Sequence, residues 1–113
     1  MEEKTLFIVD DHKMLLKGLK IYLEENSAWQ IPYVFLSAAE CLECLSKSMT
    51  ALPQIIIVDV QLKNESGFEL VRKISENYPS VKCIIYSMFD SAGYVLLAKE
   101  SGAKGYISKI AKN

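Results

Sequence analysis

Charged side chains and one hydroxyl stand where short apolar runs of this sequence end. Asp10 and Asp11 follow the first run, Asp59 ends a later one, and Ser87 and Lys109 follow the next two. Three carboxylates within about 5 Å would repel one another by roughly 3 kcal/mol per pair at an effective dielectric of about 20, so a cation must lie among them. Mg²⁺ fits, because it prefers oxygen ligands and takes one or two carboxylates plus phosphate oxygens.

Asp59 is the expected nucleophile of this group. A carboxylate can attack phosphorus and form an acyl phosphate. Asp59 stands alone at its strand tip, whereas Asp10 and Asp11 are adjacent and better placed to share the metal ion. Lys109 supplies a compact positive charge that suits a phosphate, and the Ser87 hydroxyl can donate to a phosphoryl oxygen. The residues therefore indicate phosphoryl transfer to Asp59.

These side chains meet only if the apolar runs are strands of one sheet. Runs 6–9, 55–58 and 83–86 are rich in β-branched or aromatic residues without polar alternation, which is typical of strands covered on both faces. Amphipathic stretches after Asp11 and Ser66 predict helices between the strands. This alternation predicts an α/β fold with a doubly wound parallel sheet, whose ligands bind at the carboxyl ends of the strands.

Weaker signals predict the outer elements. The stretch 31–35 contains a proline, which cannot donate to a ladder, so we expect an edge strand there, and the last strand is expected over 105–108. Capping-box patterns at Ser37 and Ser66 predict helix starts, and Gly102 predicts the end of the fourth helix.

Little sequence follows the last expected strand. Only 110–113 come after Lys109, yet a doubly wound sheet of five strands needs two helices on the face that the first helix covers. We expect that the final helix is missing from this chain. A longer protein or a second copy in a homodimer would then cover the exposed apolar face.

Length and charge limit the other possibilities. At 113 residues, half of them hydrophobic, the chain fits one domain over 1–113. The chain has thirteen basic and fourteen acidic side chains, so it lacks the excess of positive charge with which proteins bind the phosphate backbone of DNA or RNA. DNA is therefore expected as a partner only through a further domain. The opening 1–4 does not resemble a signal peptide, and no apolar run reaches about 18 residues. We therefore expect a cytoplasmic protein without a membrane partner.

Cys41 and Cys44 suggest a redox or zinc motif, but the pattern is weak. Zinc needs about four ligands, and the chain adds only the distant Cys83 and the lone His12. Both cysteines also fall inside the helix expected after Ser37, so we interpret them as packing residues. His12 is expected to lie in a first helical turn and to have no direct role in metal binding or phosphoryl transfer.

The sequence resembles the receiver domains of two-component response regulators over nearly its whole length. Residues 9–12 look like the family's acidic pair, and Val58 and Asp59 look like its phosphoacceptor site, with Gly67 at the usual spacing beyond it. The stretch from Asp10 to Leu19 is similar to receivers of the NarL/LuxR type.

Later positions extend the resemblance. Ser87 matches the family's Ser/Thr position, Tyr106 its switch aromatic and Lys109 its active-site lysine. Three positions depart from the usual pattern. Leu62-Lys63 replaces Met-Pro, Met88 replaces a small residue, and Ile110 replaces a proline. Met88 matters most, because a long side chain beside the phosphoryl site would narrow access.

The resemblance implies a flavodoxin-like (CheY-like) sheet with strand order 2-1-3-4-5. It implies a sensor histidine kinase as phosphodonor, Mg²⁺ as cofactor and the backbone carbonyl of Gln61 as a further metal ligand. It also implies a signalling domain that catalyses only its own phosphorylation and dephosphorylation, and that switches an output, of the transcriptional kind in the NarL/LuxR type.

The fourth helix carries an apolar stripe of Tyr94, Leu97 and Ala98 beside its core side, and we expect this stripe to face a partner. Two alternatives stay open. One is a degenerate receiver that binds partners without phosphorylation. The other is a phosphatase with an aspartyl intermediate, although such enzymes carry two aspartates two residues apart after the first strand.

Overall fold

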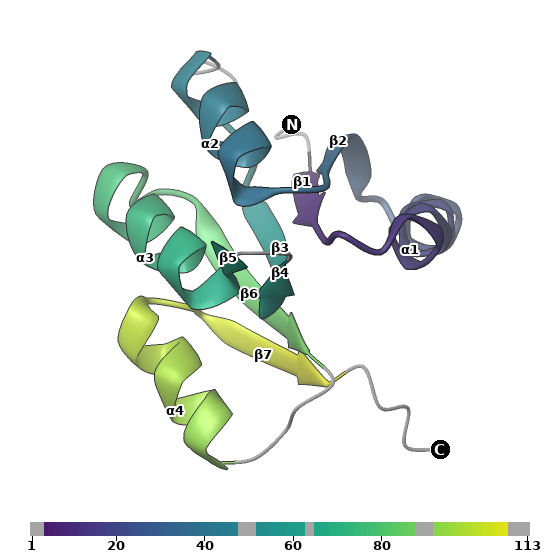
Figure 1. Cartoon of the computed structure of the whole chain (residues 1–113). Helices are drawn as coiled ribbons and strands as arrows, with labels where there is room; N and C mark the ends of the chain where they lie inside the picture. The colour runs from purple at the N-terminus through teal and green to yellow at the C-terminus, as the bar shows by residue number, and fades with distance from the viewer. Residues whose placement is uncertain (1–3, 48–51, 63–64, 88–91, 109–113) are drawn as a thin grey trace.

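A parallel sheet forms the centre of the protein (Figure 1). The computed structural model describes residues 4–47, 52–62, 65–87 and 92–108. The sheet strands are β1 (Thr5–Val9), β2 (Gln30–Phe35), β3 (Ile55–Asp59), β6 (Lys82–Ser87) and β7 (Gly105–Ser108). Their spatial order is β2-β1-β3-β6-β7, and all neighbouring pairs are parallel. The predicted order 2-1-3-4-5 is therefore confirmed, with the proline-containing strand β2 outermost.

Helices cover both faces of this sheet. They are α1 (Lys13–Asn26), α2 (Ala38–Lys47), α3 (Gly67–Asn77) and α4 (Ala92–Ser101). Figure 1 shows α1 on one side of the strands and α2, α3 and α4 on the other. Two apolar clusters correspond to these two faces: one includes Leu16 of α1, and the other includes Leu45 and Leu70 of α2 and α3. The predicted doubly wound α/β arrangement is thus confirmed.

The central strands are buried along most of their length. Val9, Ile56, Val58 and Ile85 are completely shielded from solvent. Burial of side chains this size contributes about 1.5 to 3 kcal/mol each, which makes β1, β3 and β6 the rigid part of the sheet. The packed ends of these strands therefore fix the positions of the residues that follow them in the sequence.

One predicted capping box is present and the other is not. At the start of α2, Ser37 Oγ accepts a 3.2 Å hydrogen bond from the Glu40 N–H, and Glu40 Oε1 accepts one of 3.1 Å from the Leu36 N–H. At the start of α3, the Ser66 side chain makes no capping hydrogen bond, and Glu69 pairs with Arg72 instead. The predicted helix start is confirmed, because α3 begins at Gly67 with Ser66 as its N-cap residue, but the hydrogen bonds of the capping box are absent.

Helix α4 ends as predicted at Gly102. This residue has a φ of +108°, in the region that favours glycine. Its N–H donates to Lys99 O at 3.1 Å, and the next N–H, of Ala103, donates to Ala98 O at 3.0 Å. These bonds satisfy carbonyl groups that the last helical turn leaves without partners.

A short antiparallel hairpin follows the β3 strand and was not predicted. Its strands are β4 (Gln61–Leu62) and β5 (Glu65–Ser66). It directly connects the end of β3 to the start of α3. Two-residue strands carry too little sequence pattern to be recognised in advance.

Some sequence-based expectations lie beyond what the structure describes. The missing final helix concerns the chain after Ser108, which lies outside the described residues, and the single domain over 1–113 stays a prediction. Within the described residues, no helix combines the length and apolar character needed to cross a membrane.

Cys41 is buried in the core and the partly buried Cys44 packs against it, as the packing interpretation of these two residues predicted, and Cys83 is buried as well. The side chains of Cys41 and Cys83 are 0% and 1% exposed. The pKa of each thiol is raised to about 12, chiefly by burial, and for Cys41 the neighbouring thiols Cys83 and Cys44 contribute in the same direction. Neutral thiols with this burial serve as small apolar groups.

We predict that these thiols make folding pH-dependent at alkaline pH. Their pKa is about 12 when folded and about 8.5 in an unfolded chain. The unfolded state therefore loses protons first, and the free energy of unfolding should fall as the pH rises from about 8.5 toward about 12. Urea denaturation at stepped pH measures this. The fall should be shallower in Cys41→Ala than in wild type, and equal slopes would contradict the assignment.

Candidate functional site

The parallel register brings the predicted chemical residues to one edge of the sheet. Val9 of β1 pairs with Val58 of β3, so the aspartates that follow each strand end are neighbours. On the other side of β3, Asp59 pairs with Tyr86, and Ser87 comes next on β6. The site therefore forms at the carboxyl ends of adjacent strands, as expected for ligands of such sheets.

Four of these side chains form one compact cluster. One ligand atom each from Asp10, Asp11, His12 and Asp59 lies within 4.8 Å of all the others. The side chains of Asp10 and Asp59 are only 1% and 5% exposed, and that of Asp11 is 21% exposed. The sequence predicted the three carboxylates, but not the imidazole among them.

His12 turns its ring toward the carboxylates. Its Nδ1 lies 2.8 Å from Asp10 Oδ1, 3.3 Å from Asp11 Oδ1 and 3.6 Å from Asp59 Oδ2. The His12 backbone N–H also donates to Asp10 Oδ1 at 2.8 Å. His12 is the residue just before α1 rather than part of its first turn, and its side chain makes no capping bond. The sequence did not predict this place within the cluster, and the position alone does not decide the expectation that His12 has no direct chemical role.

The carboxylate of Asp59 has two different oxygen environments. Its Oδ1 accepts a 3.2 Å hydrogen bond from the Gln61 N–H, while Oδ2 faces the His12 side of the cluster. Gln61 thus holds the Asp59 carboxylate through its backbone N–H. The predicted role of its carbonyl as a metal ligand stays a prediction.

The donor set fits a divalent cation. Asp11 Oδ1 is buried and has no hydrogen-bond partner among the described residues, since the His12 ring at 3.3 Å is not aligned for a hydrogen bond. An orphaned buried carboxylate oxygen is costly unless a cation or donor meets it. Together with Asp10 and Asp59 it offers the oxygen ligands that Mg²⁺ prefers.

Gly67 fixes the distance between α3 and the Asp59 backbone. A Cβ atom at position 67 would overlap the Asp59 carbonyl oxygen and lie 2.9 Å from the Asp59 carbonyl carbon and from Val60 Cα. The Gly67 N–H also donates to Val60 O at 2.8 Å. Only glycine permits this approach, which explains why a glycine stands at this spacing.

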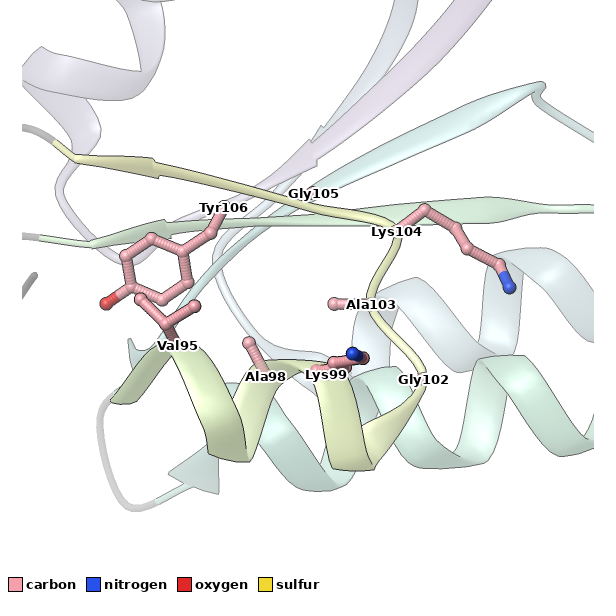
Figure 2. A pocket seen from close by; sticks show the side chains of 8 residues that line it. All are labelled: Val95, Ala98, Lys99, Gly102, Ala103, Lys104, Gly105 and Tyr106. Carbon is pink, nitrogen blue, oxygen red and sulfur yellow. The ribbon is translucent and has the colours of Figure 1, made fainter. Parts of the chain in front are cut away.

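The predicted switch residues lie on the last two strands. Ser87 is 1% exposed and pairs with Ser108 of β7. Tyr106 of β7 lines a groove of about 520 Å³ between α4 and β7. Figure 2 shows the Tyr106 ring beside Val95 at one end of this groove and Lys104 at the other. Lys109 and Met88 lie outside the described residues.

The expected apolar stripe on α4 has different exposed members. Ala98 is 2% exposed and belongs to the core, and Tyr94 stacks on Phe68 of α3 with ring centroids 6.1 Å apart. Leu97 is 50% exposed, next to Leu96 at 56%. The stripe was misplaced because α4 also packs on α3, a contact that helical spacing alone does not predict. A partner-facing role of this helix stays a prediction.

Comparison with known proteins identifies relatives for nearly the whole chain. Residues 6–113 match the response regulator receiver domain family. The oxygen regulatory protein NreC of Staphylococcus epidermidis is 34% identical over 105 residues, which cover 92% of this chain and 47% of that protein. The chain thus spans about half the length of this curated relative.

Solved structures share the same fold. A LuxR-family two-component response regulator from Aurantimonas superposes with a TM-score of 0.88 at 23% identity, covering 98% of this chain and 77% of that one. A CheY-like receiver domain protein from Methanospirillum hungatei gives a TM-score of 0.81 at 25% identity, covering 98% and 85%.

We predict that Gly67→Ala disturbs the acceptor site through the backbone. Because the added Cβ meets main-chain atoms, the variant should lose about 1 to 3 kcal/mol of unfolding free energy. Gly18→Ala is the matched control: no atom lies within 4 Å of its Cβ position, and alanine at a mid-helix position should gain about 0.5 to 1 kcal/mol. Urea denaturation measures both, and equal effects would refute the close approach.

Proposed function

Because this chain belongs to the response regulator receiver domain family, we propose that it accepts a phosphoryl group on Asp59 from a sensor histidine kinase and uses Mg²⁺ held by Asp10, Asp11 and Asp59. Members of this family are signalling domains. The proposal rests above all on the cluster in which the nearly buried Asp59 carboxylate lies against two further aspartates.

The arrangement suits Asp59 as the nucleophile. The Gln61 N–H donates a hydrogen bond to Asp59 Oδ1 and so holds the carboxylate group in one orientation at the end of β3. In the proposed transfer, an Asp59 oxygen forms a bond to phosphorus as the bond from phosphorus to the donor histidine nitrogen breaks. Asp10 and Asp11 would serve as metal ligands. The aspartates would hold Mg²⁺, which when bound would supply positive charge to offset the charge on the transferring oxygens.

Ser87 and Lys109 complete the proposed site. The Ser87 hydroxyl, at the end of the strand beside β3, can donate to a phosphoryl oxygen. Lys109 follows β7 in the sequence, and its ammonium group would pair with another phosphoryl oxygen. The Gln61 carbonyl is proposed as the remaining protein ligand of the metal ion.

Phosphorylation is proposed to change the α4 surface. Ser87 moves toward the new phosphoryl group, and Tyr106, two strand positions from Ser108, shifts within the groove that it lines with Val95 and Ala98. Local charge changes of this kind bias elements with two available arrangements. The exposed side chains of α4 would transmit the change to a partner.

In the whole protein, the output is proposed to be transcriptional. This rests on similarity to the relatives, which include a DNA-binding response regulator of the LuxR family from Staphylococcus aureus. DNA would then be contacted through a further domain, and a second copy in a homodimer stays the alternative cover for the apolar face that the sequence predicted. The cytoplasmic location expected from the sequence belongs to the same proposal.

We predict that Asp59→Asn abolishes phosphoryl uptake, because the amide keeps the shape of the carboxylate but is not a nucleophile. Incubation with acetyl phosphate and Mg²⁺, followed by intact-mass measurement, should show one added phosphoryl group in wild type and none in the variant. Relief of carboxylate repulsion should also raise its unfolding free energy by about 1 kcal/mol. Labelling of the variant would refute Asp59 as the acceptor. No labelling of folded wild type would favour the degenerate receiver.

We predict that phosphorylation changes the surroundings of α4. Backbone amide signals of Val95, Leu96 and Leu97 should shift when acetyl phosphate is added to wild type in the presence of Mg²⁺. Those of Glu25 and Asn26, at the far end of α1, should stay in place. Unchanged signals across α4 in a fully phosphorylated sample would remove this helix from the proposed output.

A further inference from the structure

We infer that His12 sets the metal selectivity of the acidic cluster, by offering its Nδ1 as a fourth ligand to transition-metal ions such as Co²⁺, Ni²⁺ and Zn²⁺ while hindering Mg²⁺. This inference rests on the proposed function only in using the same three aspartates. It concerns a side chain that the oxygen-ligand chemistry of Mg²⁺ does not require.

The spacing of Nδ1 is that of a metal ligand. Ligands bound at about 2.1 Å lie about 3.0 Å apart at the corners of an octahedron and about 3.4 Å apart at those of a tetrahedron. The Nδ1 atom lies 2.8, 3.3 and 3.6 Å from oxygens of Asp10, Asp11 and Asp59. The nitrogen therefore stands at distances from the three oxygens that are typical of, or slightly longer than, those between ligands of one ion, and the four ligand atoms of the cluster all lie within 4.8 Å of one another.

The same position makes the ring an obstacle for Mg²⁺. This ion demands oxygen ligands in octahedral geometry and keeps several of its waters. His12 Nδ1 approaches the oxygens of all three aspartates, so Mg²⁺ and its waters must push the ring aside and break its contact with Asp10. The His12 side chain is 64% exposed, so it has room to swing outward.

Ions that accept nitrogen gain from the same ring. Imidazole suits zinc, copper, iron and nickel, whereas carboxylate and water suit magnesium. When the ion binds, the proton with which Nδ1 contacts Asp10 Oδ1 is released to solvent, and the neutral tautomer with its proton on Nε2 presents the Nδ1 lone pair to the ion. Asp11 Oδ1, which has no hydrogen-bond partner among the described residues, is available to the same ion.

His12→Asn and Co²⁺ give a direct test at one fixed pH. Asparagine can keep a donor near the position of Nδ1 but lacks the imidazole. Co²⁺ binding, followed by visible absorption and calorimetry, should weaken about tenfold or more in the variant. Mg²⁺ binding to the same variant should persist, and in His12→Ala it should tighten a few-fold because the ring no longer competes.

A second readout excludes a merely structural role. His12 is the only histidine of the chain, so every imidazole NMR signal belongs to it. Co²⁺ should shift these signals strongly and Mg²⁺ should shift them only slightly. Cys44→Ser controls for binding to the half-buried thiol and should leave Co²⁺ affinity unchanged.

The outcomes separate this inference from the proposed function. Equal Co²⁺ affinity in wild type and His12→Asn, or weaker Mg²⁺ binding in a folded His12→Ala variant, would overturn the selectivity role. Asp11→Ala tests the cluster itself and should remove most binding of both ions. Undiminished Mg²⁺ binding in Asp11→Ala would overturn the proposed metal site, whatever His12 does.

Discussion

The structure depends on one constraint, which is that several carboxylates are held close together at one edge of a buried sheet. The side chains of Asp10 and Asp59 are 1% and 5% exposed, and the Asp11 carboxylate lies against them. Both desolvation and mutual repulsion work against this arrangement, and a small domain has only about 5 to 15 kcal/mol of stability in total. The packing of the apolar strands must therefore hold these carboxylates in place. Because a bound cation would relieve their repulsion, the site favours cation binding.

Helix α3 connects this charged edge to the opposite part of the molecule. At its start, Gly67 contacts the Asp59 backbone so closely that no Cβ fits. The next residue, Phe68, stacks on Tyr94 of α4, and further along α3 the Ser75 side chain contacts Gly102 at the end of α4. Strand β3, α3 and α4 are therefore linked by successive packed contacts, and the coupling proposed between Asp59 and the α4 surface would use this route.

The sequence predicted the sheet and most of the acidic cluster because both follow from strong patterns. Uninterrupted apolar runs define buried parallel strands, and a parallel sheet brings Asp10, Asp11 and Asp59 together without further information. The orientation of His12 was not predictable in this way, since it depends on one side-chain rotation near the helix start. A lone imidazole directly after two aspartates was the available signal. The start of α3 after Ser66 was predicted correctly, but the missing hydrogen bonds of that cap and the exposed side of α4 were not, because tertiary contacts rather than local spacing determine them.

The two edges of the sheet differ in their ability to pair with another strand. Along β2, exposed Pro32 removes one backbone donor, and the register with β1 shifts between Thr5 and Phe7, as at a bulge. Both features discourage a further strand from adding to this edge. The β7 edge has no proline over Gly105–Ser108 and leaves Ile107 45% exposed. At high concentration, strand-to-strand aggregation of this domain would therefore begin at β7, and a charged side chain in place of Ile107 would be the natural protection against it.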